Sequence, residues 1–246
     1  MVGVCGSGGK TSLLRSFGKI LETEGIPVIL TSTTRSEPLE EFPVFDLAQF
    51  ESSDQPSTPA LFFLRDGLTS DGKWRGLSST DVDRLGQSFP DRVILAEVDG
   101  SAGMPLKLYR TGEPVWPSRT SLAVIVMSQA AVGEKAGDVV HRLGQHPFEP
   151  LGELRSDAVW LWENSLALLT GPGGYLNQVP ADIPCVLALT CMAEQDDSIG
   201  LFEFVGEVMK ENRLPLVTFC ETTGETPYFR TACRMEDQDS VTGPEE

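Results

Sequence analysis

The sequence predicts an α/β protein of the phosphate-loop nucleotide-binding type, with a mostly parallel sheet and helices on both faces. Three observations support this: apolar strand-like runs alternate with segments of helical periodicity, short glycine turns join them, and a glycine cluster followed by Lys-Thr comes after the first run. We expect a single domain over residues 1–235, with room for a smaller C-terminal elaboration from about residue 150. The acidic tail, 236–246, is expected to be disordered.

The first half of the chain supplies the strands that open the sheet. Strands are expected at 2–5, 27–30, 60–64 and 93–96, and a short helix at 81–87. After the glycines comes a helical face that ends before Gly25, with the apolar residues Leu13, Leu14, Phe17, Ile20 and Leu21. Residues 36–59 are acidic, contain proline and lack periodicity, so we expect a long loop there, of the kind that often forms a lid. The opening strand is short, which leaves room for a start upstream of Met1.

The second half continues the alternation of strands and helices. Strands are expected at 121–127, 185–189 and 214–219, and helices at 157–170 and 199–211. In parallel sheets, ligands bind beyond the carboxyl ends of the strands. The opening glycines, "TSTT" at 31–34 and "EVDGS" at 97–101 each follow a predicted strand, so we expect these motifs to meet at one edge of the sheet.

The glycine cluster has a spacing that is two residues tighter than the common phosphate loop. That loop has Gly, four residues, Gly-Lys and Ser or Thr, and here its first glycine would fall on Val4. The cluster still offers flexible backbone amides, a helix N-terminus, a lysine and a hydroxyl, and it resembles the short loop of the Mur ligase class of ATP enzymes. The alternative is a glycine turn that only joins a strand to a helix. The predicted nucleotide-binding residues of this segment are Gly6, Ser7, Gly8, Gly9, Lys10, Thr11 and Ser12.

A pair of acids supplies the second chemical signal. Glu97 and Asp99 are two residues apart at the end of a predicted strand, so their side chains share one face of the extended chain. Next to a phosphate loop, such acids can hold Mg²⁺ together with the hydroxyl of Thr11. The alternative is that both acids simply end a strand near solvent. The sequence predicts Thr11, Glu97 and Asp99 as metal ligands and Lys10, Glu97 and Asp99 as catalytic residues.

Other polar residues support two interpretations each. The hydroxyls at 31–34 fit either contacts to a phosphate or substrate, or a turn at a strand end. Arg35 fits either charge stabilisation or a solvated surface position. His141 and Arg142 fit either a place at the same sheet edge as the other motifs or a position at the C-terminus of a helix, where they would complement its dipole. The residues alone favour the helix C-terminus. The pair Trp160 and Trp162 indicates core or interface packing rather than a base-stacking platform.

The composition excludes several classes of partner. The net charge of −17 argues against nucleic acid and anionic membranes, which require clustered Lys and Arg. No apolar run is long enough for a membrane span, and the start lacks the features of a secretion signal. Five cysteines without a CxxC pair suit free thiols in a reducing cytosol, and the two histidines fit no standard zinc motif. We therefore expect a cytoplasmic protein without zinc.

Taken in order, the motifs resemble the selenium-dependent hydroxylase accessory protein family, YqeC. The resemblance covers about residues 3–145 and is carried by "GSGGKTSLL", "TSTT", "DGKWRGLSSTDVDRL", "EVDGSAGMPLK", "GEPVWP" and "VVHRLG". The family looks like bacterial cytoplasmic proteins associated with maturation of selenium-dependent molybdenum hydroxylases, presumed to bind a nucleotide. By motif, it implies roles for Lys10, Thr11, Thr33, Glu97, Asp99, Ser101, Lys107, Glu113, His141 and Arg142.

Two departures from the family pattern bear on the ligand. Gly112 stands where the family usually has a histidine before Glu-Pro-Val. The run "TCMA" at 190–193 stands where relatives often show Asn-Lys-x-Asp, the run that reads guanine in GTP-binding proteins. Its absence favours ATP over GTP as the cofactor, with Mg²⁺. The predicted cofactor-binding set beyond the glycine loop is Thr33, Ser101, Lys107, His141 and Arg142.

The resemblance implies a pathway more firmly than a reaction, so three functions stay open. The preferred one is a slow NTPase whose bound state governs docking on a molybdenum hydroxylase or its maturation enzymes. The second is an enzyme that transfers a phosphoryl or nucleotidyl group to a small cofactor precursor, with Lys107, Arg142 and the Thr cluster lining the acceptor site. The third is an α/β binding domain that holds no nucleotide.

Overall fold

The fold is taken from a computed structural model. It describes residues 1–52, 58–100, 102–145, 151, 154–191, 198–221 and 228–233. Ser101 and the predicted tail at 236–246 lie outside the described residues. Among the helices in the described part of the chain, none is long and apolar enough to cross a membrane.

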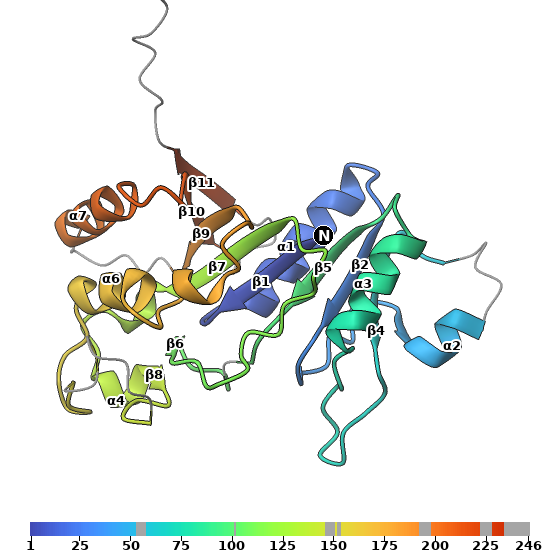
Figure 1. The fold of residues 1–246 in the computed structure, drawn as a ribbon, viewed down its shortest axis with the longest axis horizontal. Coiled ribbons are helices and arrows are strands. Elements are labelled where there is room, and N and C mark those ends of the chain that lie inside the picture. Colours follow the sequence, from blue (N-terminus) through green and yellow to red (C-terminus); the bar gives the residue numbers. More distant parts are fainter. Residues whose placement is uncertain are drawn as a thin grey trace, which may run out of the picture.

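A nine-stranded sheet runs through the described chain in the order β11-β10-β9-β7-β1-β5-β2-β4-β3 (Figure 1). Every neighbouring pair is parallel except β10 and β11, which are antiparallel. The predicted mostly parallel α/β sheet is therefore confirmed. The strands are β1 (Val2–Gly6), β2 (Val28–Ser32), β3 (Val44–Asp46), β4 (Leu61–Arg65), β5 (Val93–Glu97), β7 (Leu122–Ser128), β9 (Cys185–Thr190), β10 (Leu216–Glu221) and β11 (Tyr228–Cys233).

The two faces of the sheet are covered by different helices. Consecutive residues of a strand point to opposite faces, so Ile29 joins one hydrophobic cluster and Leu30 the other. Leu13 and Leu14 of α1 (Lys10–Thr23) cover the face of Leu30. The other face is covered by α2 (Leu47–Ser52), α3 (Ser79–Ser88), α6 (Trp162–Thr170) and α7 (Ser198–Val208). Helices on both faces explain why the central strands are apolar throughout.

Residues 36–59 contain more regular structure than the predicted long loop. The prediction is wrong for residues 44–52, which form β3 and α2. β3 pairs with β4 at the edge of the sheet, and Phe45 and Phe50 stack against Phe62 of β4. A three-residue strand is too short to show a period, and these aromatic contacts exist only once the sheet has formed.

The predicted helix at 157–170 begins five residues later, at Trp162. Trp160 is buried, and its amide donates to the carbonyl of Glu134, which holds the segment before α6 in an extended path. The side-chain oxygen of Asn164 accepts from the amide of Leu161, so the helix starts after Leu161. The core position predicted for Trp160 is confirmed. Smaller corrections are helix starts at Ser79 and Ser198, an end of α7 at Val208, and a β10 shifted two residues toward the C-terminus.

Several short elements were not predicted. β6 (Leu106–Lys107) and β8 (Val140–His141) form a separate two-stranded sheet, and α4 (Ala136–Val139) precedes β8. β11 adds the antiparallel edge strand, and two 3₁₀ turns follow β7 and α6, η2 (Gln129–Ala131) and η3 (Leu176–Gln178). Apart from β11, these elements have two to four residues, which are too few for a periodic pattern to indicate a helix or a strand.

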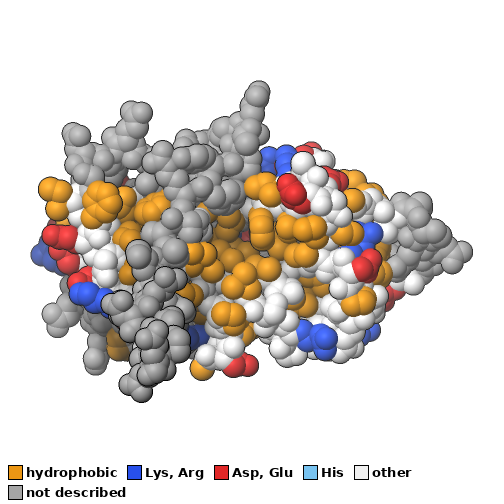
Figure 2. Space-filling view, turned by 90° about the horizontal axis from the view of Figure 1, so that it is seen from above, with side chains coloured by type: hydrophobic (Ala, Val, Ile, Leu, Met, Phe, Trp, Pro, Cys, Tyr) orange, Lys and Arg blue, Asp and Glu red, His pale blue; other side chains and the backbone are white. Residues whose placement is uncertain are grey.

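The surface carries exposed apolar residues beside the acidic ones. Ile199 and Phe202 on α7 are 72% and 76% exposed. On the face shown in Figure 2, hydrophobic side chains gather near the middle, and charged side chains lie toward the edges.

We expect Gly6→Ala to destabilise the protein more than Gly67→Ala. Both glycines have positive φ, +93° and +78°, so both substitutions introduce backbone strain. A Cβ at Gly6 would lie 2.1 Å from the carbonyl oxygen of Val126, whereas a Cβ at Gly67 meets nothing within 4 Å. The steric clash should lower the unfolding free energy of Gly6→Ala by a further amount of about 1–3 kcal/mol. Denaturant titration of both variants would measure the difference. Equal losses in the two variants would contradict the close packing of Gly6 against β7.

Candidate functional site

The site lies at the carboxyl ends of the central strands, where the strand order reverses. From β1 the chain passes through α1 to β2, which lies beyond β5 on one side, while β7 lies on the other side of β1. Val4 of β1 and Ser32 of β2 both pair with the position of Glu97 on β5. Such a switch point is where ligands bind in open parallel sheets. The structure thus brings the glycines, the Thr cluster and Glu97 to one edge.

The glycine loop, residues 6–9, is held by neighbouring strands. Gly6, Gly8 and Gly9 all have positive φ, which turns successive amides in a way that residues with a Cβ rarely allow. The amide of Ser7 donates to Val126 at 2.9 Å, and its hydroxyl donates to the Met104 carbonyl at 2.5 Å. The loop is therefore fixed before any ligand arrives.

Thr190, at the end of β9, holds the loop from another direction. Its hydroxyl donates to the carbonyl of Gly8, and its side-chain atoms would lie 3.2–3.3 Å from a Cβ placed at Gly9. The sequence showed Thr190 only as the first residue of the "TCMA" run, so its contact with the loop was not predicted. Thr190, which is far from the glycine loop in the sequence, therefore helps to hold the loop in place.

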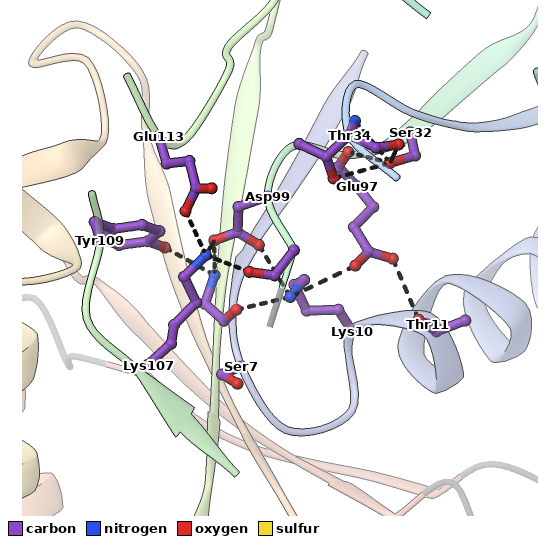
Figure 3. Close-up of polar contacts among 12 residues, drawn as sticks. Ser7, Lys10, Thr11, Ser32, Thr34, Glu97, Asp99, Lys107, Tyr109 and Glu113 are labelled. Atoms are coloured by element: carbon purple, nitrogen blue, oxygen red, sulfur yellow. Dashed lines mark hydrogen bonds and ion pairs between the residues drawn. The ribbon is translucent and has the colours of Figure 1, made fainter. Parts of the chain in front are cut away.

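Lys10, the first residue of α1, is buried beneath the loop with its amine among oxygens. Nζ donates to the Gly6 carbonyl at 2.8 Å and lies 2.9 Å from Asp99 Oδ1 and 3.5 Å from Glu97 Oε1 (Figure 3). Burial lowers the pKa of Lys10, but the carboxylates of Asp99 and Glu97 offset it and the pKa is raised. The ammonium is therefore retained.

Thr11 and Glu97 form an oxygen pair beside Lys10. The Thr11 hydroxyl donates to Glu97 Oε2 at 3.2 Å, from the first turn of α1 (Figure 3). Burial is the main cause that raises the pKa of Glu97, Asp99 raises it further, and Lys10 and Thr11 oppose the rise. A cation at this position would favour the carboxylate form.

Asp99 is fully buried and contacts two lysines and the loop backbone. Its Oδ2 accepts from the Gly6 amide at 3.0 Å and lies 3.4 Å from Lys107 Nζ, while Oδ1 pairs with Lys10. The same Gly6 amide lies 2.9 Å from the hydroxyl oxygen of Tyr109, a residue that the sequence did not single out. Asp99 thus lies behind Lys10 and positions the loop.

A second cluster continues from Lys107 to Arg142. Lys107 Nζ donates to the Gly100 carbonyl at 2.5 Å and to Glu113 Oε2 at 3.1 Å, and it has no exposure. Arg142 Nη1 donates to the same Glu113 oxygen at 2.8 Å. Burial alone would raise the pKa of Glu113, but Arg142 and Lys107 lower it to about 2. The pairs form a charge-alternating series, Lys10, Asp99, Lys107, Glu113 and Arg142.

One cavity of about 1350 Å³ borders both clusters. The predicted residues that line it are Gly8, Gly9, Lys10, Thr11, Ser12, Thr33, Glu97, Glu113, His141 and Arg142. Gly6, Ser7, Asp99 and Lys107 lie behind this wall, and Ser101 lies outside the described residues. Arg110, which the sequence did not single out, also lines the cavity and pairs with Glu113 at 2.8 Å.

The contacts of the Thr cluster and of Arg142 distinguish between the two interpretations of each. Thr31 and Thr33 donate to the carbonyls of Leu64 and Val115, so these hydroxyls hold neighbouring chain segments, as expected for a strand-end turn. His141 belongs to β8, and Arg142 contacts a carboxylate and a carbonyl outside the preceding four-residue helix. The contacts of Arg142 thus support the sheet-edge interpretation rather than the dipole.

Fold and site together define a mostly parallel α/β protein with a glycine loop, a buried lysine and an acidic pair at its strand ends. The family model described as YqeC protein matches residues 2–144, which include both charged clusters. The chain is also 31% identical over 210 residues to a protein of Escherichia coli (strain K12) called "Uncharacterized protein YqeC", covering 83% of this chain and 81% of that relative. The chain belongs to the YqeC family, as the motifs predicted. No solved structure matches it significantly.

Asp99→Asn is expected to reduce the unfolding free energy by about 3 kcal/mol or more, because it leaves two buried ammonium groups without their shared carboxylate. Asp157→Asn is the matched control, since Asp157 pairs with Arg155 at 2.8 Å on the exposed surface. Its unfolding free energy should stay near that of the unmodified protein in denaturant titrations. A small effect of Asp99→Asn would show that Lys10 and Lys107 do not depend on this carboxylate.

Proposed function

We propose that the protein binds a nucleoside triphosphate with Mg²⁺ at the glycine loop and hydrolyses it slowly. The observation that carries this is the arrangement at the start of α1, where left-handed glycines, the Lys10 ammonium and the Thr11–Glu97 oxygen pair border one cavity. Amides and a helix N-terminus favour phosphate, and the lysine adds a mobile charge. The loop would be a shortened phosphate loop.

The residues present fit a magnesium ion. Mg²⁺ prefers one or two protein carboxylates or hydroxyls and takes its remaining ligands from phosphates and water. Thr11 and Glu97 supply such oxygens 3.2 Å apart at the cavity wall. Among the described residues, no group of three or more His, Cys, Asp and Glu gathers into a metal site, which suits a cation that arrives with the nucleotide. When bound, Mg²⁺ would neutralise charge between Glu97 and the phosphates.

The charges also explain why the metal would be required. Lys10 and Lys107 balance Glu97 and Asp99, so the loop region carries no net charge before ligand binding. A bare triphosphate would meet the carboxylate of Glu97 and be repelled. With Mg²⁺ held by Glu97 and Thr11, Lys10 becomes free to turn from the carboxylates to the phosphates. Asp99, behind Lys10, would hold the loop rather than the metal.

Slow hydrolysis suits the same contacts. A catalytic base must be able to take a proton from the attacking water. Both acids beside the loop already contact Lys10, and Glu97 also accepts from Thr11. Neither carboxylate is therefore free to act as a strong base. The bound state of the nucleotide, rather than its turnover, would then be the useful output, with ATP favoured over GTP because the guanine-reading run is absent.

The biological role that we propose is accessory, in maturation of selenium-dependent molybdenum hydroxylases. The support is the resemblance of the motif set and membership of the family. The segment 36–59 supports partner docking less than the sequence suggested, because residues 44–52 are regular parts of the fold. Group transfer to a small cofactor precursor stays the second candidate, since the cavity extends past the glycine loop to Arg110 and Arg142.

Lys10→Ala should weaken binding of ATP and Mg²⁺ at least about tenfold, because a charge-assisted bond to an ionised group contributes about 1.5–3 kcal/mol. Lys19→Ala is the matched control: Lys19 lies on the same helix, is exposed and pairs with Glu41. Calorimetric titration with ATP and with GTP would measure both variants. Equal affinities in Lys10→Ala and the unmodified protein would indicate that the loop is only a structural turn. If neither nucleotide binds below millimolar concentration, the proposal is refuted.

Hydrolysis should rise when a purified selenium-dependent molybdenum hydroxylase is added, if nucleotide state governs docking. Glu97→Gln should abolish this rise while nucleotide binding falls less, because the amide is a poorer metal ligand than the carboxylate. Phosphate release at saturating ATP and Mg²⁺ would measure it. Fast turnover with a small molecule alone would contradict the accessory role and favour group transfer.

A further inference from the structure

The cavity has a basic wall, made of Arg110 and Arg142, which both pair with Glu113. Glu113 lies 2.8 Å from Arg110 Nε and 2.8 Å from Arg142 Nη1, and Lys107 lies 3.1 Å from its other side. One carboxylate thus faces three cations. Because Lys107 is shared with Asp99, Arg110 and Arg142 are left with a single negative charge between them.

Arg35 does not contribute to this positive excess. It lines the same cavity as Asp71, whose pKa is lowered first by the Thr69 hydroxyl and, to a smaller extent, by Arg35. Lys73, also at the cavity, pairs with Glu37 at 2.5 Å. The charges of this part of the cavity therefore balance, and the positive excess lies at Arg110 and Arg142.

The backbone of Arg142 is strained. Its φ of +67° lies in the left-handed region, which costs free energy for a residue with a Cβ and is usually filled by Gly or Asn. The side chain is held by both oxygens of Glu113 and by the carbonyl of Leu108 at 3.3 Å. An arginine fixed in a strained conformation at a cavity wall is typical of a ligand-binding position.

The basic wall is separate from the glycine loop. In the series of ion pairs, Asp99 and Lys107 lie between Lys10 and Glu113 (Figure 3). A further cavity of about 400 Å³ shares Met104, His141 and Arg142 with the main one. The open space at His141 and Arg142 thus continues beyond the main cavity.

We propose that the basic wall of Arg110 and Arg142 binds an anionic group of a second small molecule, with the charge and size of a phosphate. Two guanidinium groups offer the planar, paired donors that suit such a group. His141 lies beside Arg142 at the cavity wall, where burial first, and then Arg142 and Lys107, lower its pKa. This inference deepens the proposed function. It rests on that function in one respect, which is that the second molecule and the nucleotide would share one cavity.

The test is calorimetric titration of inorganic phosphate into protein saturated with Mg²⁺ and a non-hydrolysable ATP analogue. Arg110→Gln should lower phosphate affinity about fivefold or more, because it removes one charge-assisted contact from a partly exposed site. Its side chain is 70% exposed, so folding is not at risk. Arg84→Gln is the matched control, an exposed arginine that pairs with Asp81 on α3 outside the cavity, and its phosphate affinity should be unchanged.

A second arm separates this inference from the nucleotide proposal. Phosphate is titrated into Lys10→Ala protein without nucleotide, where binding should persist and should again depend on Arg110. This arm supports the basic wall even if no nucleotide binds. The inference is overturned if phosphate affinity is the same with and without Arg110, or if saturation with the ATP analogue abolishes phosphate binding, which would assign the wall to the nucleotide's own phosphates.

Discussion

The carboxylate of Asp99 is the group on which the geometry of the site depends. It lies between two buried ammonium groups and also accepts from the Gly6 amide. Without a negative charge at this point, Lys10 and Lys107 would repel each other in a region from which water is excluded. Asp99 therefore connects the glycine loop to Lys107 of β6, in addition to the contacts of Ser7 with Met104 and of Gly6 with Tyr109.

The ion pairs of Asp99 and Glu113 allow several cationic side chains to lie close together at the site. Each buried cation has a carboxylate beside it, so the cost of burying charge is offset by pairing. The pairs also connect the loop to Glu113 and Arg142, across the end of the sheet. A change of charge at Lys10 would therefore alter the electrostatic environment of Glu113 and Arg142, which line the same cavity.

Much of the fold could be predicted, because the central strands carry apolar side chains on both faces. Ile29 and Leu30, or Ile94 and Leu95, read as buried strands without knowledge of their neighbours. β3 could not be predicted, since its three residues show no period and Phe45 gains its partners only from the assembled sheet.

Part of the site could likewise be predicted from local motifs. Lys10, Thr11 and Glu97 belong to short patterns, and the structure brings them into contact. Tyr109, Arg110 and Thr190 were missed because their importance comes from contacts with residues far away in the chain, and no local pattern signals them. The contact between Thr190 and Gly8 has a further consequence for how the chain can be divided. The family match ends at residue 144, yet β9 pairs with β7 from Ala123 to Ser128, and Thr190 contacts the glycine loop from beyond that boundary. A fragment cut there would present β7 as an open, apolar edge, which invites association with other chains. The strand that shields this edge thus comes from outside the matched segment.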